Sequence, residues 1–389
     1  KAILQRRIEA GADKALEQVI ARYDLRDGFE ADALADAEAA HTVAHTALGR
    51  RDLRHIPTVT IDAPSTRDID DAISVLPAGP DGALRLLVSI ADVARFVPVG
   101  SALDRAARER GTSVYLAGRV LSMLPETLSN EWLSLLPDQE RSALTVELRV
   151  DCEGCIAAVD VYESLIRSWA RLDYTEVGAF LDRGDVSPAM ERVRDMLPWF
   201  RTASARIGLA RARRGGVEVA REETRVVLDT ETGAPIGIEG VRATSAHLMI
   251  ERFMVAANEA IAIWLRDRGV PGVYRVHDQP DAEPVEDLAA AAHHFGFAPG
   301  FGRTLTPLSL AAFEMQISGA PSEPALRSVL LRSLGPARYT VTPSSHFGLA
   351  APLYLHFTSP IRRYADLAVH RLIKQYLEGH RAFHPEDPE

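Results

Sequence analysis

The chain has 389 residues, of which 47% are hydrophobic and 25% charged, a composition that is typical of a folded globular protein and excludes a disordered one. Its formal net charge of −10 has the wrong sign for a protein that coats nucleic acid nonspecifically, so a polyanionic partner would need a local arginine-lined channel. The apolar runs are too short, or too interrupted by charges, to cross a bilayer, and no membrane partner is expected. Two cysteines cannot build a disulfide scaffold, so we expect a reducing, cytoplasmic location.

The hydrophobic pattern predicts helices first, then strands, then more helices. Residues 1–54 are expected to be helical, with an alanine- and glutamate-rich run over 31–47. Short apolar runs then predict strands over 59–61, 72–75 and 84–90, and two hairpins, one pairing 143–150 with 156–164 and one over 217–238. Further helices are predicted over 101–110, 176–183, 188–213, 246–268, 283–295 and 363–377.

This order of elements predicts an α+β fold with a mixed sheet. No internal repeat and no low-complexity linker interrupts residues 56–377, so we expect one large domain over 55–377. A small helical segment or linker (1–54) would precede it, and a short tail (378–389) would follow. The sequence has no G-x-x-x-x-G-K-[ST] motif, so no nucleotide cofactor is expected, and we expect a monomer.

Four aspartates within ten positions form the most informative part of the sequence: Asp62, Asp68, Asp70 and Asp71. Asp62 ends a predicted strand, and the Pro-Ser-Thr turn after it can bring the later carboxylates back toward it. Like charges this close raise one another's pKa unless a cation neutralises them. Such hard oxygen ligands suit Mg²⁺ or Mn²⁺, and a pair of these ions is a common means of cleaving a phosphodiester. The alternative is an acidic surface turn, although such turns are uncommon between two apolar strands.

The run from residue 60 to residue 72 resembles the D-x₅-D-x-D-D signature of the ribonuclease II/R (RNB) family of 3′→5′ exoribonucleases. The similarity continues in chain order over about residues 56–377, and several motifs in the right order are far more specific than one. The later segments that resemble family motifs are Ser89–Val93, Gly100–Asp104, Arg110–Leu116, Met123–Ser129, Glu251–Asn258, Val273–His277, His346–Leu349 and Phe357–Arg371.

The resemblance implies an RNB-type catalytic domain whose mixed sheet and packed helices surround a deep channel for single-stranded RNA. It implies processive hydrolysis from the 3′ end to 5′-mononucleotides, with Mg²⁺ as the cofactor and Mn²⁺ as a substitute. By this resemblance Asp62, Asp68, Asp70 and Asp71 hold the metal, and Asp70, Asp71 and Arg362 are catalytic. Carboxylates supply no nucleophile of their own, so a metal-activated water would attack the phosphorus.

Arg362 and Arg363 follow Thr-Ser-Pro-Ile near the predicted C-terminal helix. Ser359 is expected to cap that helix, which places Arg362 in its first turn, where backbone N–H groups also face outward. Two arginines there form an anion site suited to a scissile phosphate. The alternative is a surface salt bridge from Arg362 to Asp366, four residues later. The resemblance favours RNA binding by both arginines.

Tyr115 and Tyr174 match family positions that bind RNA inside the channel. Tyr115 corresponds to an aromatic residue that stacks on the 3′-terminal base, and Tyr174 to one that contacts the RNA further out. Stacking requires only a flat ring face and is independent of base sequence. For both residues a core tyrosine is the alternative, and it is stronger for Tyr174. A second stacking aromatic of some family members would fall near Pro271, where this chain departs from the family.

Two other functions remain open, a catalytically silent RNA-binding protein on the same fold and a DNA-directed exonuclease. The first is disfavoured because the four aspartates and the arginine motif are all present. For the second, only contacts to the 2′-hydroxyl would distinguish the two polymers. Family members commonly carry β-barrel RNA-binding domains on either side. Residues 1–54 look helical instead, and the tail 378–389 would be the start of an S1-type domain.

Overall fold

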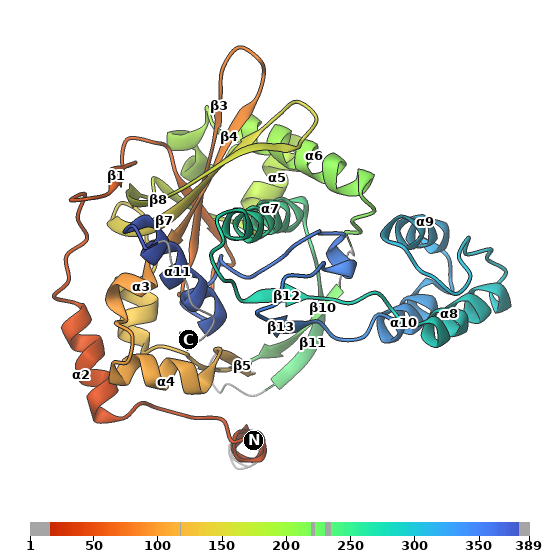
Figure 1. Cartoon of the computed structure of the whole chain (residues 1–389), viewed down its shortest axis with the longest axis horizontal. Helices are drawn as coiled ribbons and strands as arrows, with labels where there is room; N and C mark the ends of the chain where they lie inside the picture. The colour runs from red at the N-terminus through yellow and green to blue at the C-terminus, as the bar shows by residue number, and fades with distance from the viewer. Residues whose placement is uncertain (1–15, 117, 219–221, 230–234, 381–389) are drawn as a thin grey trace.

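A seven-stranded mixed sheet forms the centre of the molecule, as this computed structural model shows (Figure 1). The structure describes residues 16–116, 118–218, 222–229 and 235–380. The strand order is β1-β8-β7-β4-β3-β2-β9, in which β1 with β8 and β2 with β9 are parallel and the other pairs are antiparallel. The strands span Arg51–Asp52 (β1), Val59–Asp62 (β2), Asp71–Pro77 (β3), Leu84–Ala91 (β4), Glu140–Val150 (β7), Ile156–Arg167 (β8) and Ala170–Asp173 (β9). The predicted α+β class with a mixed sheet is confirmed.

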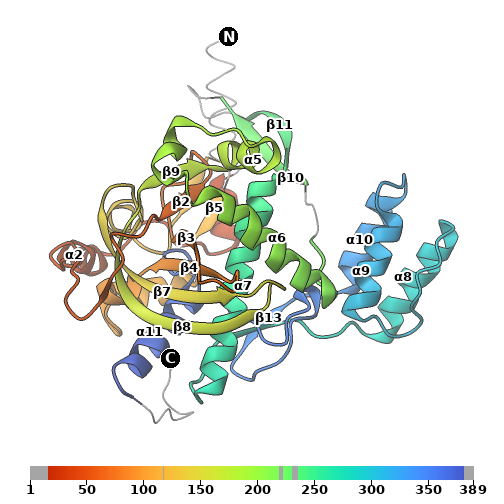
Figure 2. The ribbon, with the colours of Figure 1, turned by 90° about the horizontal axis from the view of Figure 1, so that it is seen from above.

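Three helices cover one face of this sheet (Figures 1 and 2). They are α5 (Tyr174–Arg183), α6 (Leu197–Arg213) and the long α7 (Ser245–Asp267). Phe200 and Phe253 pack their rings 6.4 Å apart between α6 and α7, against buried valines and leucines of the central strands. Each fully buried ring contributes roughly 2–3 kcal/mol by leaving water, so this layer holds the sheet and its long helix together.

Four other helices pack on the opposite face, α2 (Ala31–Ala40), α3 (Val93–Phe96), α4 (Ala102–Arg110) and α11 (Tyr364–Leu377). Ile361 and Leu367 are buried in this second core together with side chains of β3 and β4. The C-terminal helix therefore docks directly against the sheet, although about 300 residues separate it from β3. Ser101 caps α4 by accepting a hydrogen bond from the backbone N–H of Asp104, at the start of the helix predicted over 101–110.

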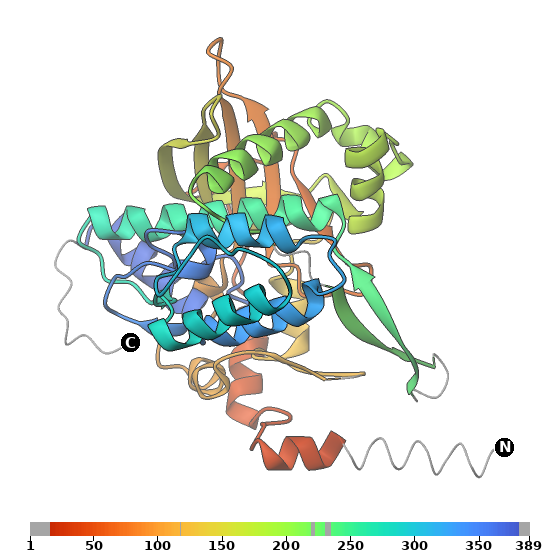
Figure 3. The same cartoon turned by 90° about the vertical axis from the view of Figure 1, so that its right-hand side faces the viewer.

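A three-helix unit projects from the sheet core (Figures 1 and 2) and lies in front of it in the view of Figure 3. It contains α8 (Ala282–His294), α9 (Pro307–Ile317) and α10 (Glu323–Ser333), which share their own hydrophobic cluster. The short ribbon of β12 (Tyr274–Val276) and β13 (Arg338–Thr340) lies between this unit and α11 (Figure 1). The remaining elements are the hairpins β5 (Val114–Leu116) with β6 (Arg119–Leu121) and β10 (Glu222–Leu228) with β11 (Pro235–Arg242), and the single turns η1 (Thr127–Trp132), η2 (Pro188–Val193) and η3 (Phe347–Leu349).

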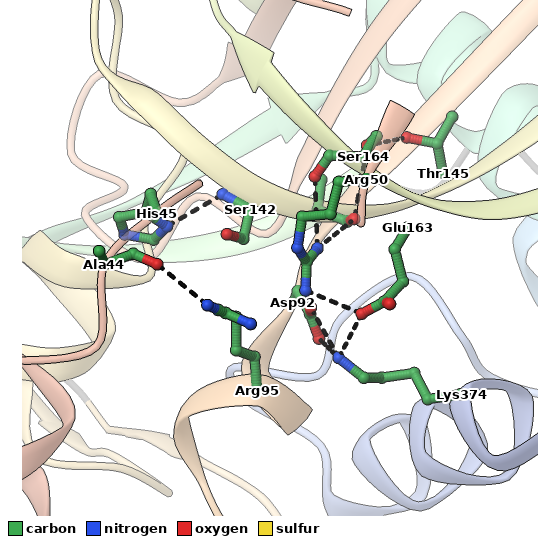
Figure 4. A network of polar contacts seen from close by, with 11 residues as sticks. Ala44, His45, Arg50, Asp92, Arg95, Ser142, Thr145, Glu163, Ser164 and Lys374 are labelled. Carbon is green, nitrogen blue, oxygen red and sulfur yellow. Dashed lines mark hydrogen bonds and ion pairs between the residues drawn. The ribbon is translucent and has the colours of Figure 1, made fainter. Parts of the chain in front are cut away.

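A buried ionic network fastens α11 to the sheet (Figure 4). Asp92, at the end of β4, is fully buried and receives both Lys374 Nζ at 2.8 Å and Arg50 Nη2 at 2.6 Å. Glu163 of β8 completes the network, 2.7 Å from Lys374 and 2.8 Å from Arg50. Burial alone would raise the pKa of Asp92, but the charges of Lys374 and Arg50 outweigh it and hold that pKa below its usual value. The buried charges are therefore mutually compensated.

Two predicted helices differ from those observed. The helix expected over 188–213 is divided into η2 and α6, and Pro198 stands at the start of α6, where a proline is tolerated because its missing N–H would have no helical partner. The helical run expected over 31–47 ends at Ala40, and the expectation that residues 1–54 are helical is wrong at Arg51–Asp52, which form strand β1 beside β8. In the described part of the chain, no helix has the length and apolar character needed to cross a membrane. Residues 1–15 and the tail 381–389, with its predicted S1-type start, lie outside the described residues.

Candidate active site

The β2–β3 connection brings the four predicted aspartates together. Asp62 is the last residue of β2 and Asp71 the first of β3, and these antiparallel strands pair through Val59 and Ile73. The chain therefore leaves and re-enters the sheet at one end, with Asp68 and Asp70 in the connection. The charges of Asp71 and Asp68 both act on Asp62, and those of Asp68 and Asp71 act on Asp70, so the four carboxylates form one electrostatic cluster.

Burial and mutual repulsion raise the pKa of three of these carboxyl groups. Burial is the main cause for Asp62, with the negative charges of Asp71 and Asp68 adding to it. Burial likewise raises the pKa of Asp70 and Asp71, and the nearby positive charge of Arg362 opposes the rise at both. Arg171 also lowers the pKa of Asp62, and Arg363 also lowers that of Asp71. Even so, the pKa values of all three buried acids stay raised. The cluster therefore favours an additional cation.

The C-terminal arginine motif lies directly against this cluster. The backbone N–H of Ile361 donates to Asp70 Oδ1 at 2.9 Å, and Arg362 Nε lies 3.7 Å from Asp70 Oδ2. The Arg362 side chain is 47% exposed, so its guanidinium can still reach a ligand from the solvent side. The structure thus joins two motifs that lie at opposite ends of the sequence.

The predicted place of Arg362 in the first helical turn is wrong. The helix α11 begins at Tyr364, and Arg362 belongs to a turn in which the backbone N–H groups of Arg362 and Arg363 donate to the carbonyl of Ser359 at 3.3 and 3.0 Å. Two hydrogen bonds fix the backbone between Ser359 and Arg363: the Ser359 N–H donates to Asp366 Oδ1 at 2.8 Å, and the Ile361 N–H donates to Asp70. Local sequence signals do not indicate the contact with Asp70, which lies far away in the chain.

Arg363, and not Arg362, makes the salt bridge to Asp366. Its Nε and Nη2 donate to the two oxygens of Asp366 at 2.8 and 2.7 Å, a two-point contact that leaves this arginine in a fixed orientation. The alternative considered for Arg362, a salt bridge to Asp366, is therefore not observed. Of the two arginines, Arg362 has the more available guanidinium.

Tyr115 comes to the site through the backbone around Arg362. The N–H of Ser113 donates to the Arg362 carbonyl at 3.0 Å, and Thr112 Oγ1 donates to the same oxygen at 2.9 Å. Two residues later, the Tyr115 hydroxyl donates to Asp68 Oδ2 at 3.0 Å. Burial and the adjacent Asp68 charge raise the pKa of Tyr115 to about 12, so its hydroxyl keeps its proton. The side chain is 53% exposed and available for stacking.

Tyr174 lies at the first position of α5, close enough to the cluster that the charges of Asp71 and Asp62 help burial to raise its pKa. One face of its ring stacks on His247, with centroids 3.9 Å apart and planes inclined by 16°. This contact agrees with the alternative of a packed tyrosine more closely than the contacts of Tyr115 do. RNA binding by Tyr174 stays a prediction that depends on its remaining surface.

The donor set fits a divalent metal ion. Asp62 Oδ2 is buried and has no hydrogen-bond partner, which is costly for a carboxylate oxygen unless a ligand satisfies it. Within the described ranges, no three acidic, histidine or cysteine side chains form a ready-made metal cage. Mg²⁺ does not need one, because it commonly takes one or two carboxylates and completes its shell with water and substrate phosphates.

Arg171 is a site residue that the sequence did not reveal. It stands on β9, opposite Thr60 of β2, and its Nη2 donates to the carbonyls of Thr66 at 2.6 Å and Pro64 at 3.4 Å. It thereby fastens the connection that carries Asp68. Only the parallel pairing of β9 with β2 creates this contact, and no local pattern in the sequence indicates that pairing.

A family model described as RNB domain matches residues 50–379. The chain belongs to the RNB domain family. Among curated RNB relatives, it is 38% identical to ribonuclease R of Thermotoga maritima over 379 residues and 37% identical to ribonuclease R of Aquifex aeolicus over 371 residues. These alignments cover 96% and 94% of this chain but 53% and 52% of the relatives, so the chain spans about half their length.

A solved RNB structure has the same arrangement. Mycoplasma genitalium RNase R in complex with ribose-methylated single-stranded RNA superposes with a TM-score of 0.84 at 35% identity, covering 90% of this chain and 55% of that one. An RNB relative with this fold has therefore been solved in complex with RNA.

Proposed function

We propose that this chain is a metal-dependent 3′→5′ exoribonuclease that hydrolyses single-stranded RNA processively to 5′-mononucleotides. One observation carries the proposal: a cluster of four aspartates, three of them with raised pKa values, lies against Arg362, which is partly exposed. The cluster suits Mg²⁺, with Mn²⁺ as a substitute, and the arginine suits the phosphate that is cut. The ribonuclease R names of the relatives agree with this chemistry.

The side chains have distinct roles in this proposal. Asp62, Asp68, Asp70 and Asp71 would hold the metal, and the unpartnered Asp62 Oδ2 gives it one oxygen that is not otherwise engaged. When bound, the metal supplies Lewis acidity for phosphodiester hydrolysis. Arg362 would bind a non-bridging phosphate oxygen and stabilise the charge that develops there as the bond breaks.

Tyr115 and Arg363 would hold the RNA strand around this centre. The exposed Tyr115 ring would stack on a base near the 3′ end, while its hydroxyl keeps the ring next to Asp68. Arg363 would contribute positive charge from a fixed position, because its Nε and Nη2 already donate to Asp366. Tyr174 would contact RNA further out. We retain the division into 1–54, 55–377 and 378–389, the monomeric state and the cytoplasmic location as predictions.

The decisive experiment incubates 5′-labelled single-stranded RNA and DNA of the same base sequence with the protein in Mg²⁺, Mn²⁺ or EDTA. We expect shortening of the RNA from its 3′ end in either metal, none in EDTA, and little shortening of the DNA. Chromatography should identify the released products as nucleoside 5′-monophosphates. An excess of unlabelled RNA added after the start separates processive from distributive degradation.

Each other outcome points to a different function. Equal degradation of DNA and RNA would assign the site to a general 3′ exonuclease. Tight RNA binding without shortening in any metal would assign it to a silent RNA-binding protein. Products that end in a 3′-phosphate would contradict the hydrolysis proposed here, because the scissile bond would then be the wrong one.

A further inference from the structure

Arg275 and Tyr339 form a cross-strand pair near the arginine motif. The two residues are directly opposite each other in the antiparallel β12–β13 ribbon. The guanidinium carbon of Arg275 lies 4.7 Å from the centroid of the Tyr339 ring, which is a cation–π contact. This stack holds the plane of a flexible side chain in one orientation.

His356 anchors the pair through Tyr339. The Tyr339 hydroxyl and His356 Nδ1 share a hydrogen bond of 2.6 Å, and the two rings meet edge to face at 5.6 Å. His356 belongs to the segment that leads into Ser359 and the arginine motif. Tyr339 nevertheless stays 42% exposed. The stacked pair of Arg275 and Tyr339, called the platform below, is therefore fixed at the Tyr339 hydroxyl and still accessible to solvent.

The platform extends the positive charge of the active site. Burial lowers the pKa of His356 to about 3, and the charges of Arg363, Arg275 and Arg362 all contribute to this lowering. The charge of Arg275 therefore acts on the same imidazole as those of Arg362 and Arg363. Tyr339 is also joined directly to the segment of the arginine motif, because its partner His356 stands three positions before Ser359.

Arg275 has no carboxylate partner in the part of the chain that the structure describes. Arg363 is paired with Asp366, and Arg362 faces Asp70, but no ion pair of Arg275 occurs among the described residues. The Arg275 guanidinium lies over the Tyr339 ring and keeps its donors for another partner. A planar guanidinium of this kind suits a phosphate group.

We propose that Arg275 and Tyr339 form an additional subsite for the sugar–phosphate backbone of single-stranded RNA, upstream of the phosphate at Arg362. Arg275 donates its fork to one non-bridging phosphate, and Tyr339 keeps the fork oriented and contacts the adjoining nucleotide. The inference rests on the proposed function and deepens it, because it assigns a second phosphate of the same strand to this chain.

The test measures binding of 5′-labelled single-stranded RNA by protein carrying Asp70→Asn, so that cleavage does not interfere. A set of oligonucleotides carries one uncharged methylphosphonate at successive positions counted from the 3′ end. We expect one position, on the 5′ side of the scissile phosphate, at which the neutral linkage weakens binding about tenfold. Adding Arg275→Gln should weaken binding of unmodified RNA by a similar factor and remove the effect of methylphosphonate at that one position only.

Arg338→Gln is the matched control. It removes the same charge from β13, next to Tyr339, but Arg338 already forms an ion pair with Asp278. We expect it to leave binding and the methylphosphonate pattern unchanged. Arg275→Lys, which keeps the charge but loses the planar fork, should recover only part of the affinity, and thermal melting of each variant shows whether the ribbon remains folded.

Unchanged RNA binding by a folded Arg275→Gln variant would overturn the inference. A methylphosphonate pattern that is the same with and without Arg275→Gln would overturn it too. The proposed function would survive that result, because the parent protein would still bind and degrade RNA. Equal losses from Arg275→Gln and Arg338→Gln would mean that only general positive charge is involved, and would also overturn the subsite.

Discussion

The Tyr115 hydroxyl donates a hydrogen bond to Asp68, with 3.0 Å between Tyr115 Oη and Asp68 Oδ2. A ring suited to stacking on a base is thereby held by its tip at the edge of the carboxylate cluster. The position of the base and the position of the metal ligands are then coupled through one hydrogen bond. Two substitutions of this residue can separate the contribution of the ring from that of the hydroxyl.

We expect Tyr115→Ala to degrade long RNA at nearly the parent rate but to stop early and leave longer end products. Long substrates make many other contacts, whereas short ones depend on the stack, which contributes about 1–3 kcal/mol per base. Tyr115→Phe keeps the ring and should restore the parent product length. A ladder of 5′-labelled RNA on a gel measures this, and identical end products for the alanine variant and the parent would remove Tyr115 from the 3′ end.

Asp70→Asn should abolish hydrolysis while single-stranded RNA still binds. The amide oxygen can still accept the Ile361 N–H, so the junction between the motifs is kept, but the negative charge needed for the metal is lost. Single-turnover cleavage and equilibrium binding are measured on the same protein. Asp287→Asn on the exposed side of α8 is the control and should change neither. Hydrolysis near the parent rate would exclude Asp70 from the metal site.

Arg362→Lys should lower the cleavage rate about 100-fold, the loss typical of one oriented donor to a developing negative charge, with little change in RNA affinity. Lysine keeps the positive charge but cannot form a forked contact with a phosphate. Arg303→Lys, which alters a surface ion pair with Glu286, is the control. Equal losses in affinity and in rate would show that Arg362 acts in ground-state binding instead.

Lys374→Met should destabilise the protein by about 3 kcal/mol at pH 7, because it leaves the buried Asp92 with only Arg50 as a cationic partner. In the parent, the depressed pKa of Asp92 means that its stabilising contribution is complete above the usual carboxyl range and is lost as the pH falls through the lower folded value. In the variant the pKa of Asp92 rises, so the carboxyl takes up a proton earlier.

The stability deficit of Lys374→Met should therefore shrink as the pH falls from 7 toward 4. Urea unfolding at several pH values measures this deficit, provided that the free energy of unfolding depends on urea concentration with the same slope in both proteins. Arg303→Met, a change of equal charge on the surface, should cost less than about 0.5 kcal/mol throughout. A deficit that is independent of pH would show that Lys374 contributes by packing and not through Asp92.

Local patterns in the sequence predicted the strands that carry the aspartates. The continuous apolar runs around Val59, Ile73 and Leu86 reflect strands buried on both faces of the sheet, and this constraint acts residue by residue. Helices α9 and α10 were not predicted, although the pattern was present: Thr306 and Pro307 start α9, and Leu310 leads a helical spacing of buried residues. A capping threonine, a proline and a helical spacing are all local features of the sequence.

Other parts of the site have no local signal. The turn that places Arg362 ahead of α11 is set by hydrogen bonds to Asp70 and Asp366, which lie on different elements. The cross-strand stack of Arg275 and Tyr339 depends on the register of two strands that are more than 60 residues apart. Such contacts are properties of the folded topology, and a single sequence specifies them only through the complete fold.

The hydrogen bond from Ile361 to Asp70 joins residues 291 positions apart in the chain. Ribosomes synthesise the aspartate cluster long before the arginine motif, so a growing chain holds the four aspartates without Arg362. The complete candidate site can form only after residues beyond Arg363 have left the ribosome and α11 has docked. A chain that ended before Ser359 would therefore contain all four aspartates and still lack the assembled site.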